Sequence, residues 1–198
     1  MSSNVERKRK ARMQRIIDAG ARVFAQKGYH ATRMQDIADE LDLQKGSLYY
    51  YFKSKEALLF QIIEDELGRA LINIEAVMTS EASPVAKIEQ AIAAHLVTFH
   101  RFADIYSIFL FEKLNSINKD AAQQIDALGR RYEEYWYQLL QEGVEAGSIS
   151  AEIDLKLATK AIMGMCNMSL VWFRPAGRMS IEEIAVHFTH YILHGMAM

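Results

Sequence analysis

The chain has 198 residues, 51% of them hydrophobic and 24% charged, which excludes collagen, mucins and long disordered tails and suits one or two small globular domains. Two prolines and 10 glycines are too few to interrupt the many strands of a sandwich or barrel, so helices are favoured. The net charge of −2 conceals a basic segment over residues 1–55, with 12 Lys or Arg against 6 Asp or Glu, which favours nucleic acid as its partner.

Four helices are predicted in the first 78 residues. Apolar residues at helical spacing are followed by Gly28, which can end the first helix in a left-handed conformation. Thr32 and Gln35 form a capping box that begins the second helix, and a turn of about three residues separates it from a short third helix. Ser54 can cap the fourth. The predicted ranges are 7–27, 32–41, 45–52 and 54–78.

The remaining chain also has helical periodicity. Pro84 suits the first position of a helix because its missing N–H is not needed there, and Gly147 supplies a stop. The predicted ranges are 84–102, 103–115, 118–146, 152–173 and 180–196. The chain is therefore predicted to be all-α, with about nine helices.

The order of helix, capped helix, tight turn and short helix, with a basic surplus, is that of a helix-turn-helix unit, whose second short helix enters the major groove. Leu48 and Phe52, four residues apart, can anchor the helix at 45–52 inward, and Gly46 allows close approach of a backbone. Any one of the remaining polar side chains could be a half-buried packing residue, but the set suits contacts to phosphates and bases. Its members are Arg33, Lys45, Ser47, Tyr49, Tyr50, Tyr51 and Lys55.

Two stretches closely resemble the DNA-binding signature of the TetR family of transcriptional regulators. They are ATRMQDIA at 31–38 and KGSLYYYFKSKEAL at 45–58. The resemblance covers about residues 16–59 and implies a three-helix DNA-binding domain over 1–55 and a larger helical ligand-binding and dimerisation domain over 56–198. It implies phosphate contacts by Thr32, Tyr49, Tyr51 and Lys55, and base contacts by Arg33, Lys45, Gly46, Ser47 and Tyr50.

Two positions depart from the family pattern. Gln44 stands where many members have Ser or Thr, and Tyr51 replaces a frequent His. These departures leave DNA binding intact and the operator sequence open.

The resemblance also implies a homodimer in which the last two long helices of each copy pair into a four-helix bundle. In this chain those helices are 152–173 and 180–196. The second carries a coherent apolar stripe, which is the predicted dimer interface: Ile181, Ile184, Ala185, Phe188, Tyr191 and Ile192.

TetR-like regulators usually respond to a small molecule in the larger domain, and this domain has adaptable apolar side chains that could line a cavity or simply form core. Residues 172–185 resemble a C-terminal segment of TetR-like regulators of fatty-acid, phenylacetate and sterol breakdown, several of which sense acyl-CoA thioesters. An acyl-CoA needs cations for its phosphates as well as an apolar site. The candidate ligand residues are Phe99, Phe102, Tyr106, Phe109, Arg130, Tyr132, Trp136, Met165, Met168, Trp172, Arg174 and Arg178.

Other site chemistry is not expected. The sequence has no GxSxG elbow, phosphate loop, HExxH or paired-carboxylate motif, so we predict neither an enzyme nor a cofactor. His187, His190 and His194 share a helical face away from the apolar stripe, which favours solvated side chains over a metal site.

Cysteine content and hydropathy point to the cytoplasm. Cys166 stands alone and cannot form an intrachain disulfide or a Cys-based zinc site. The chargeless apolar run at 161–173 is too short to span a bilayer, and no export signal is indicated.

The favoured hypothesis is a homodimeric repressor that a hydrophobic small molecule releases from operator DNA, with an acyl-CoA as one candidate effector. Two alternatives stay open. The first is an effector-independent architectural or adaptor dimer on DNA, and the second is a sensor of multiple drugs or free fatty acids.

Overall fold

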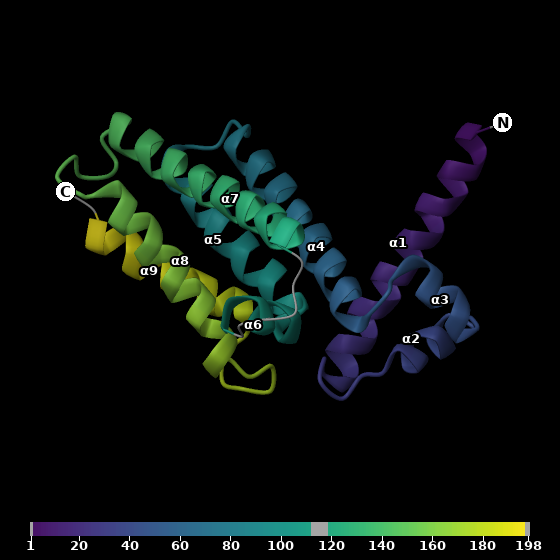
Figure 1. The fold of residues 1–198 in the computed structure, drawn as a ribbon. Helices are drawn as coiled ribbons and strands as arrows, with labels where there is room; N and C mark the ends of the chain where they lie inside the picture. The colour runs from purple at the N-terminus through teal and green to yellow at the C-terminus, as the bar shows by residue number, and fades with distance from the viewer. Residues whose placement is uncertain (1, 112–118, 197–198) are drawn as a thin grey trace. The chain divides into compact units, whose positions relative to one another are not determined.

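The computed structural model describes residues 2–111 and 119–196, and within these ranges it contains nine α-helices and no strand (Figure 1). The prediction of an all-α fold is confirmed. None of the helices described is both long and apolar enough to cross a membrane. The helices are α1 (Ser2–Lys27), α2 (Met34–Glu40), α3 (Lys45–Tyr51), α4 (Lys55–Met78), α5 (Pro84–Arg101), α6 (Ala103–Phe111), α7 (Lys119–Glu145), α8 (Leu155–Trp172) and α9 (Ile181–Met196).

The observed helix ends lie within a few residues of the predicted ones at most positions. The main difference is α1, which begins at Ser2 where the apolar pattern predicted residue 7. The preceding residues carry no apolar stripe, so periodicity could not detect them. The end of the predicted helix 103–115 lies outside the described residues.

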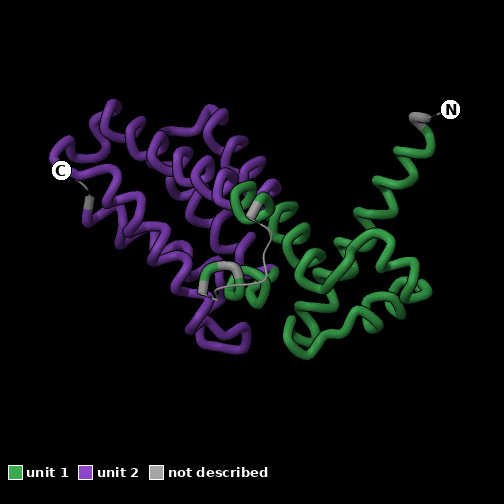
Figure 2. The backbone as a smooth tube through the Cα atoms, viewed as in Figure 1, with its two compact units in different colours: residues 1–66, 102–125 green, residues 67–101, 126–198 purple. Residues whose placement is uncertain are grey.

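The chain divides into two compact units (Figure 2), one of residues 1–66 and 102–125 and the other of residues 67–101 and 126–198. The first unit extends beyond the predicted boundary at residue 55 because it includes the first turns of α4 and all of α6. Leu58, Leu59 and Ile63 of α4 are completely buried, and α6 packs against α1.

Gly28 ends α1 as predicted, with a φ of 77° and its N–H donating to the carbonyl of Phe24. The predicted capping box of Thr32 and Gln35 is wrong by one residue. Arg33 is the N-cap of α2, and its backbone N–H donates to the Asp36 carboxylate at 2.7 Å. The Arg33 guanidinium has no acceptor for the return bond, so only the half of a capping box that Asp36 supplies is formed.

The turn between α2 and α3 is tight. Asp42 adopts a left-handed conformation with φ 52°, which Asp tolerates better than most residues, and the Leu43 N–H donates back to the Ala38 carbonyl at 2.8 Å. Leu48 is completely buried and Phe52 is 5% exposed. These two residues anchor α3 as predicted, and its opposite face is exposed.

In the second unit, α5 packs against α8 and α9 and buries an apolar stripe that includes Ile88, Ile92 and Leu96. Lys87 at the start of α5 forms an ion pair with Glu142 of α7 at 2.9 Å. Gly147, with φ 71°, follows the end of α7. This arrangement places the central part of α5 in the core of the unit.

Candidate nucleic-acid interface and effector-binding regions

The exposed face of α3 holds the central group of predicted DNA-contacting residues. Tyr49 and Tyr50 are 36% and 67% exposed, and Lys45, Gly46 and Ser47 are also exposed. The Lys45 ammonium lies 5.8 Å from the centre of the Tyr49 ring. A Cβ added at Gly46 would meet no atom within 4 Å, so this end of α3 is open to a closely approaching surface.

Tyr51 differs from its neighbours because it is half-buried. Its ring lies edge-on to that of Tyr50, with 5.2 Å between the ring centres. This contact restricts both rings and supports the exposed Tyr50 side chain.

Arg33 is exposed at the start of α2, where its side chain is available to an external anion. The adjacent Asp36 carboxylate is held by Lys27, whose ammonium lies at 2.8 Å. The hydrogen bond from Lys27, followed by that from the Arg33 backbone, lowers the pKa of Asp36. The Asp36 carboxylate is therefore ionised near neutral pH while Lys27 and the Arg33 backbone N–H hold it.

Thr32 does not offer its hydroxyl to the surface. Its side chain is 1% exposed, and the hydroxyl donates to the Gly28 carbonyl at 2.8 Å. The single hydroxyl proton is used in this bond, and the phosphate contact that the resemblance implies for Thr32 stays a prediction. In the structure Thr32 closes the loop between α1 and α2.

Lys55 also makes contacts within its own unit that the sequence did not indicate. Its ammonium donates to the carbonyls of Tyr29, His30 and Thr32 at 2.9, 3.3 and 3.0 Å, and it lies 4.3 Å from the centre of the Tyr29 ring. An ammonium has three N–H donors, and all three are used. Lys55 therefore ties the α1–α2 loop to α4, and the predicted direct hydrogen bond to a phosphate requires one of these bonds to break.

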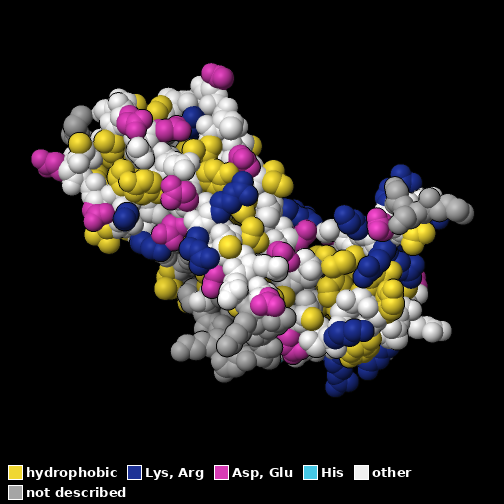
Figure 3. All heavy atoms as spheres, turned by 45° about the horizontal axis from the view of Figure 1, so that its top comes forward, with side chains coloured by type: hydrophobic (Ala, Val, Ile, Leu, Met, Phe, Trp, Pro, Cys, Tyr) yellow, Lys and Arg dark blue, Asp and Glu magenta, His cyan; other side chains and the backbone are white. Residues whose placement is uncertain are grey.

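Cations along α1 form a further basic surface that the sequence-based site prediction left out. Lys and Arg side chains gather over the unit that contains this helix (Figure 3). Five of the six positions at 7–12 are Lys or Arg, and all of them are exposed. This charge run lies in the predicted helix 7–27, but the resemblance assigned no DNA contact to it, and its position beside the turn between α2 and α3 came from the tertiary structure.

The candidate ligand residues Phe99, Tyr132 and Trp136 form part of the buried core of the second unit. They are 4%, 4% and 0% exposed and surround His95. The imidazole of His95 stacks on Phe99 with 4.1 Å between ring centres. In this conformation the rings contact one another, so a ligand among them would have to separate them.

His95 has hydrogen-bond partners for both ring nitrogens. Nδ1 lies 3.1 Å from the Tyr132 hydroxyl, and Nε2 lies 3.0 Å from Oδ1 of Asn167. Burial lowers the pKa of His95 to about 4 and raises that of Tyr132. Both side chains are consequently neutral near pH 7, and they form a polar centre in an otherwise apolar core.

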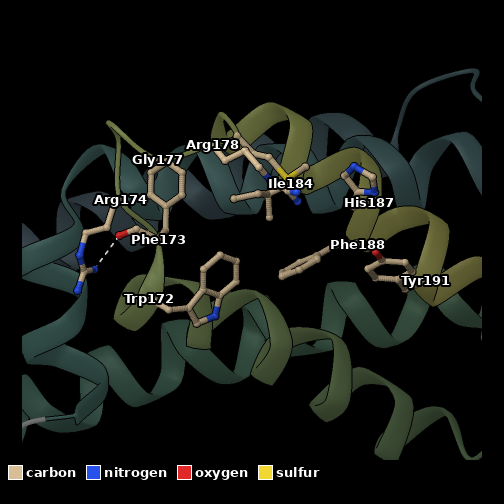
Figure 4. Close-up of a pocket in the computed structure, with 10 residues that line it drawn as sticks. Trp172, Phe173, Arg174, Gly177, Arg178, Ile184, His187, Phe188 and Tyr191 are labelled. Carbon is tan, nitrogen blue, oxygen red and sulfur yellow. Dashed lines mark hydrogen bonds between the residues drawn. The ribbon is translucent and has the colours of Figure 1, made fainter.

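A cavity of about 410 Å³ lies between the end of α8, the following loop and α9 (Figure 4). The Trp172 and Phe188 rings line it and pack edge to face, with 6.2 Å between their centres, and Tyr191 lies beyond Phe188. Arg174 caps the end of α8 by donating to the carbonyls of Val171 and Phe173 at 3.1 and 2.8 Å. Arg178 also lines the cavity and is exposed. The lining of this cavity combines aromatic side chains with two arginines, of which Arg174 is bonded to the backbone.

The other candidate ligand residues do not line this cavity. Phe102 and Tyr106 belong to the first unit, and the side chain of Phe109 lies outside the described residues. Arg130 lines a separate cavity of about 660 Å³ between α7 and α8. Met165 is half-buried and Met168 is 50% exposed. Helical spacing placed these residues on faces but could not show which faces meet.

The apolar stripe predicted as the dimer interface is partly internal. Ile184 and Ala185 are 6% and 3% exposed because α9 packs against α5, so they belong to the core of this unit, and their place in a dimer interface stays a prediction. Ile181, Phe188 and Ile192 are half-buried, and Tyr191 is 60% exposed.

A longer exposed apolar stripe lies on α8, the other helix predicted to pair in the dimer, for which no interface residues were named. Leu157, Met168, Val171 and Trp172 are 68%, 50%, 52% and 48% exposed, and the small residues Ala161 and Gly164 between them are also exposed. The spacing of 157, 161, 164, 168 and 171 is that of one helical face. Contiguous exposed apolar patches are a common feature of interaction sites.

The cysteine and the histidines of α9 were also weighed as site residues. Among the described residues, no group of three His, Cys, Asp or Glu is placed to hold a metal ion. The Cys166 thiol is buried, and burial raises its pKa to about 12. His194 contacts the His190 carbonyl through Nδ1 at 2.8 Å, and His187 and His190 are exposed.

Two family models match the chain. The model described as "Tetracyclin repressor-like, C-terminal domain" matches residues 81–196, and the one described as "Bacterial regulatory proteins, tetR family" matches residues 16–62. The chain is 25% identical over 182 residues to the HTH-type transcriptional repressor KstR2 of Rhodococcus jostii, covering 92% of this chain and 89% of the relative. It is 29% identical over 163 residues to the fatty acid metabolism regulator protein of Bacillus subtilis, covering 81% of each.

The fold is also similar to that of AibR in its crystal structure with isovaleryl coenzyme A and operator DNA. The TM-score is 0.75 at 25% sequence identity, with 91% of this chain and 97% of AibR covered. The family models and this similarity agree with the predicted helix-turn-helix unit and larger helical domain.

Proposed function

The chain belongs to the TetR family of transcriptional regulators, and on this premise we propose that it is a homodimeric repressor that a hydrophobic small-molecule effector releases from operator DNA. The prediction of a regulator and not an enzyme agrees with this family. The observation that carries the DNA-binding part is the exposed face of α3, with a cation, an open glycine and hydroxyls on a helix anchored by Leu48.

For DNA binding, we propose that α3 enters the major groove. Lys45, Ser47, Tyr49 and Tyr50 are accessible there, and Arg33 flanks them from α2. Two such helices in a dimer reach successive major grooves when they are about 34–36 Å apart. Base contacts then set specificity, while phosphate contacts set register.

The test of this interface is operator affinity measured by fluorescence anisotropy over a range of salt concentrations. The double variant Lys45→Ala/Tyr49→Phe should bind at least about tenfold more weakly. A matched control, Lys156→Ala/Tyr137→Phe, makes the same chemical change in the second unit and should bind like the original protein. Unchanged affinity and salt dependence for the first variant would remove α3 from the interface.

For the dimer, the exposed stripe on α8 supports pairing with the same stripe of a second copy. Removing its leucine, methionine, valine and tryptophan side chains from water is favourable in proportion to the apolar area buried. Met168→Glu/Val171→Glu should convert the dimer to a monomer in analytical ultracentrifugation, because charges would then be buried without partners. A variant that sediments as a dimer would exclude this face.

For the effector, the cavity of Trp172 and Phe188 supports an amphiphile with an apolar end and an anionic end. Its arginines suit phosphates, and AibR, a structural relative, was crystallised with isovaleryl coenzyme A. We therefore propose an acyl-CoA as the effector class. An effector weakens DNA binding only if it binds the DNA-free conformation better.

The effector test adds long-chain acyl-CoA, free fatty acid and free CoA separately to the complex with DNA from the region beside the protein's own gene. Release by acyl-CoA alone, with weaker release for Arg178→Gln than for the control Lys156→Gln, supports the proposal. Release by free fatty acid points to a sensor of that class. Specific DNA binding that no effector disturbs favours the architectural dimer.

A further inference from the structure

The N-terminal half of α1 carries a line of cations that is separate from the DNA-contacting face of α3. Lys8, Arg12 and Arg15 are separated by four and three residues, so they lie along one face of the helix, which we call the α1 stripe. All three side chains are exposed. All of them precede residue 16, where the match to the family's DNA-binding model begins.

The position of the α1 stripe relative to the helix-turn-helix unit follows from a small cavity of about 140 Å³. Arg12 and Arg15 line this cavity together with Leu41, Asp42 and Leu43, the turn between α2 and α3. Lys8 lies one helical turn further toward the N-terminus. The α1 stripe therefore begins beside the turn that leads into α3 and extends away from it along α1.

The electrostatics of the α1 stripe favour an external anion. Like charges at this spacing repel one another and destabilise a helix. Within the described residues, none of the three cations forms an ion pair or a side-chain hydrogen bond, whereas Arg22 on the same helix is paired with Glu40 at 3.6 Å. Asp42 is the acidic residue among those that line the cavity. One carboxylate against three cations leaves a net positive charge along the α1 stripe.

We propose that the α1 stripe binds the phosphate backbone of the operator beside the groove that α3 enters. This inference rests on the proposed DNA-binding function and extends the interface along α1. A duplex presents phosphates on both sides of its major groove, and the first helix of a helix-turn-helix crosses this backbone when the second is in the groove, so cations close to the α2–α3 turn are near the phosphates in this arrangement. Phosphate contacts carry no sequence information, so the stripe contributes affinity and register but not base specificity.

The experiment compares two triple variants of the full-length protein with the same loss of charge on the same helix. Lys8→Gln/Arg12→Gln/Arg15→Gln removes the α1 stripe, and Arg7→Gln/Arg9→Gln/Lys10→Gln removes three cations that lie off it. Glutamine retains helix propensity, and circular dichroism verifies that both variants fold. Affinity for operator and for scrambled DNA is measured by fluorescence anisotropy from about 0.05 to 0.3 M salt.

The slope of log K against log salt concentration becomes shallower by about 0.9 for each phosphate contact that is lost. The stripe variant loses three such contacts in each protomer, so its slope should become shallower by about 2.7 for each protomer. We expect operator and scrambled DNA to lose affinity by the same factor, at least about tenfold at 0.1 M salt. The control variant should change the slope by less than about one. Equal changes of slope and affinity in the two variants would overturn the proposal, because the effect would then depend on total charge and not on the α1 stripe. If the unmodified protein does not prefer operator DNA over scrambled DNA, the proposed function itself is overturned.

Discussion

Replacing His95 with glutamine should flatten the dependence of stability on pH. His95 is 1% exposed, and burial lowers its pKa from 6.5 to about 4 in the folded chain. In the unfolded chain the imidazole returns to its ordinary pKa. Unfolding therefore takes up a proton between these values, so the stability that His95 contributes is fully present above pH 6.5 and is lost as the pH falls toward 4.

The size of the effect follows from the two pKa values. Lowering the pH from neutral to 5 reduces the free energy of unfolding by about 2 kcal/mol through His95 alone. Below pH 4 this reduction reaches its full value of about 3 kcal/mol. Glutamine has no charged form in this range. The His95→Gln variant should therefore lose about 2 kcal/mol less than the original chain between pH 8 and pH 5.

The measurement is urea unfolding at pH 8, 7, 6 and 5, followed by far-UV circular dichroism. The compared quantity is the change in the free energy of unfolding with pH, because the substitution also removes contacts at every pH. Tyr50→Ala, a surface change in the other unit, serves as a control and should retain the full pH dependence. Parallel curves for the original chain and His95→Gln would refute a buried neutral imidazole.

Three substitutions test the contacts that stabilise the DNA-binding unit. Leu48→Ala removes a completely buried side chain and should cost about 2–5 kcal/mol in urea unfolding, with operator binding abolished as α3 detaches. Gly28→Ala places a Cβ at φ 77° and should cost about 1–2 kcal/mol, seen as a lower Tm in calorimetry. Lys55→Met leaves the Tyr29, His30 and Thr32 carbonyls without the ammonium, and hydrogen exchange of the α1–α2 loop should accelerate, whereas the exposed control Lys53→Met should leave it unchanged.

Local features of the chain predicted most of the helices and the DNA-binding face. Glycines 28 and 147 ended helices as predicted because a left-handed terminus is a property of one residue and its nearest neighbours. The outward Tyr50 and inward Leu48 followed from the period of 3.6 residues within α3. The family signature at 31–58 added the DNA-binding role, since these positions are contiguous in the sequence.

Tertiary contacts decided the roles that local pattern left open. Thr32 and Lys55 have the chemistry of phosphate ligands, but packing of the α1–α2 loop directs them to backbone carbonyls. Ile184 and Leu157 are equally apolar, and the placement of α9 against α5 buries one while the other stays exposed on α8. Amphipathic periodicity specifies that a helix has an apolar face; which neighbour covers that face depends on residues distant in the sequence, whose packing no local window contains.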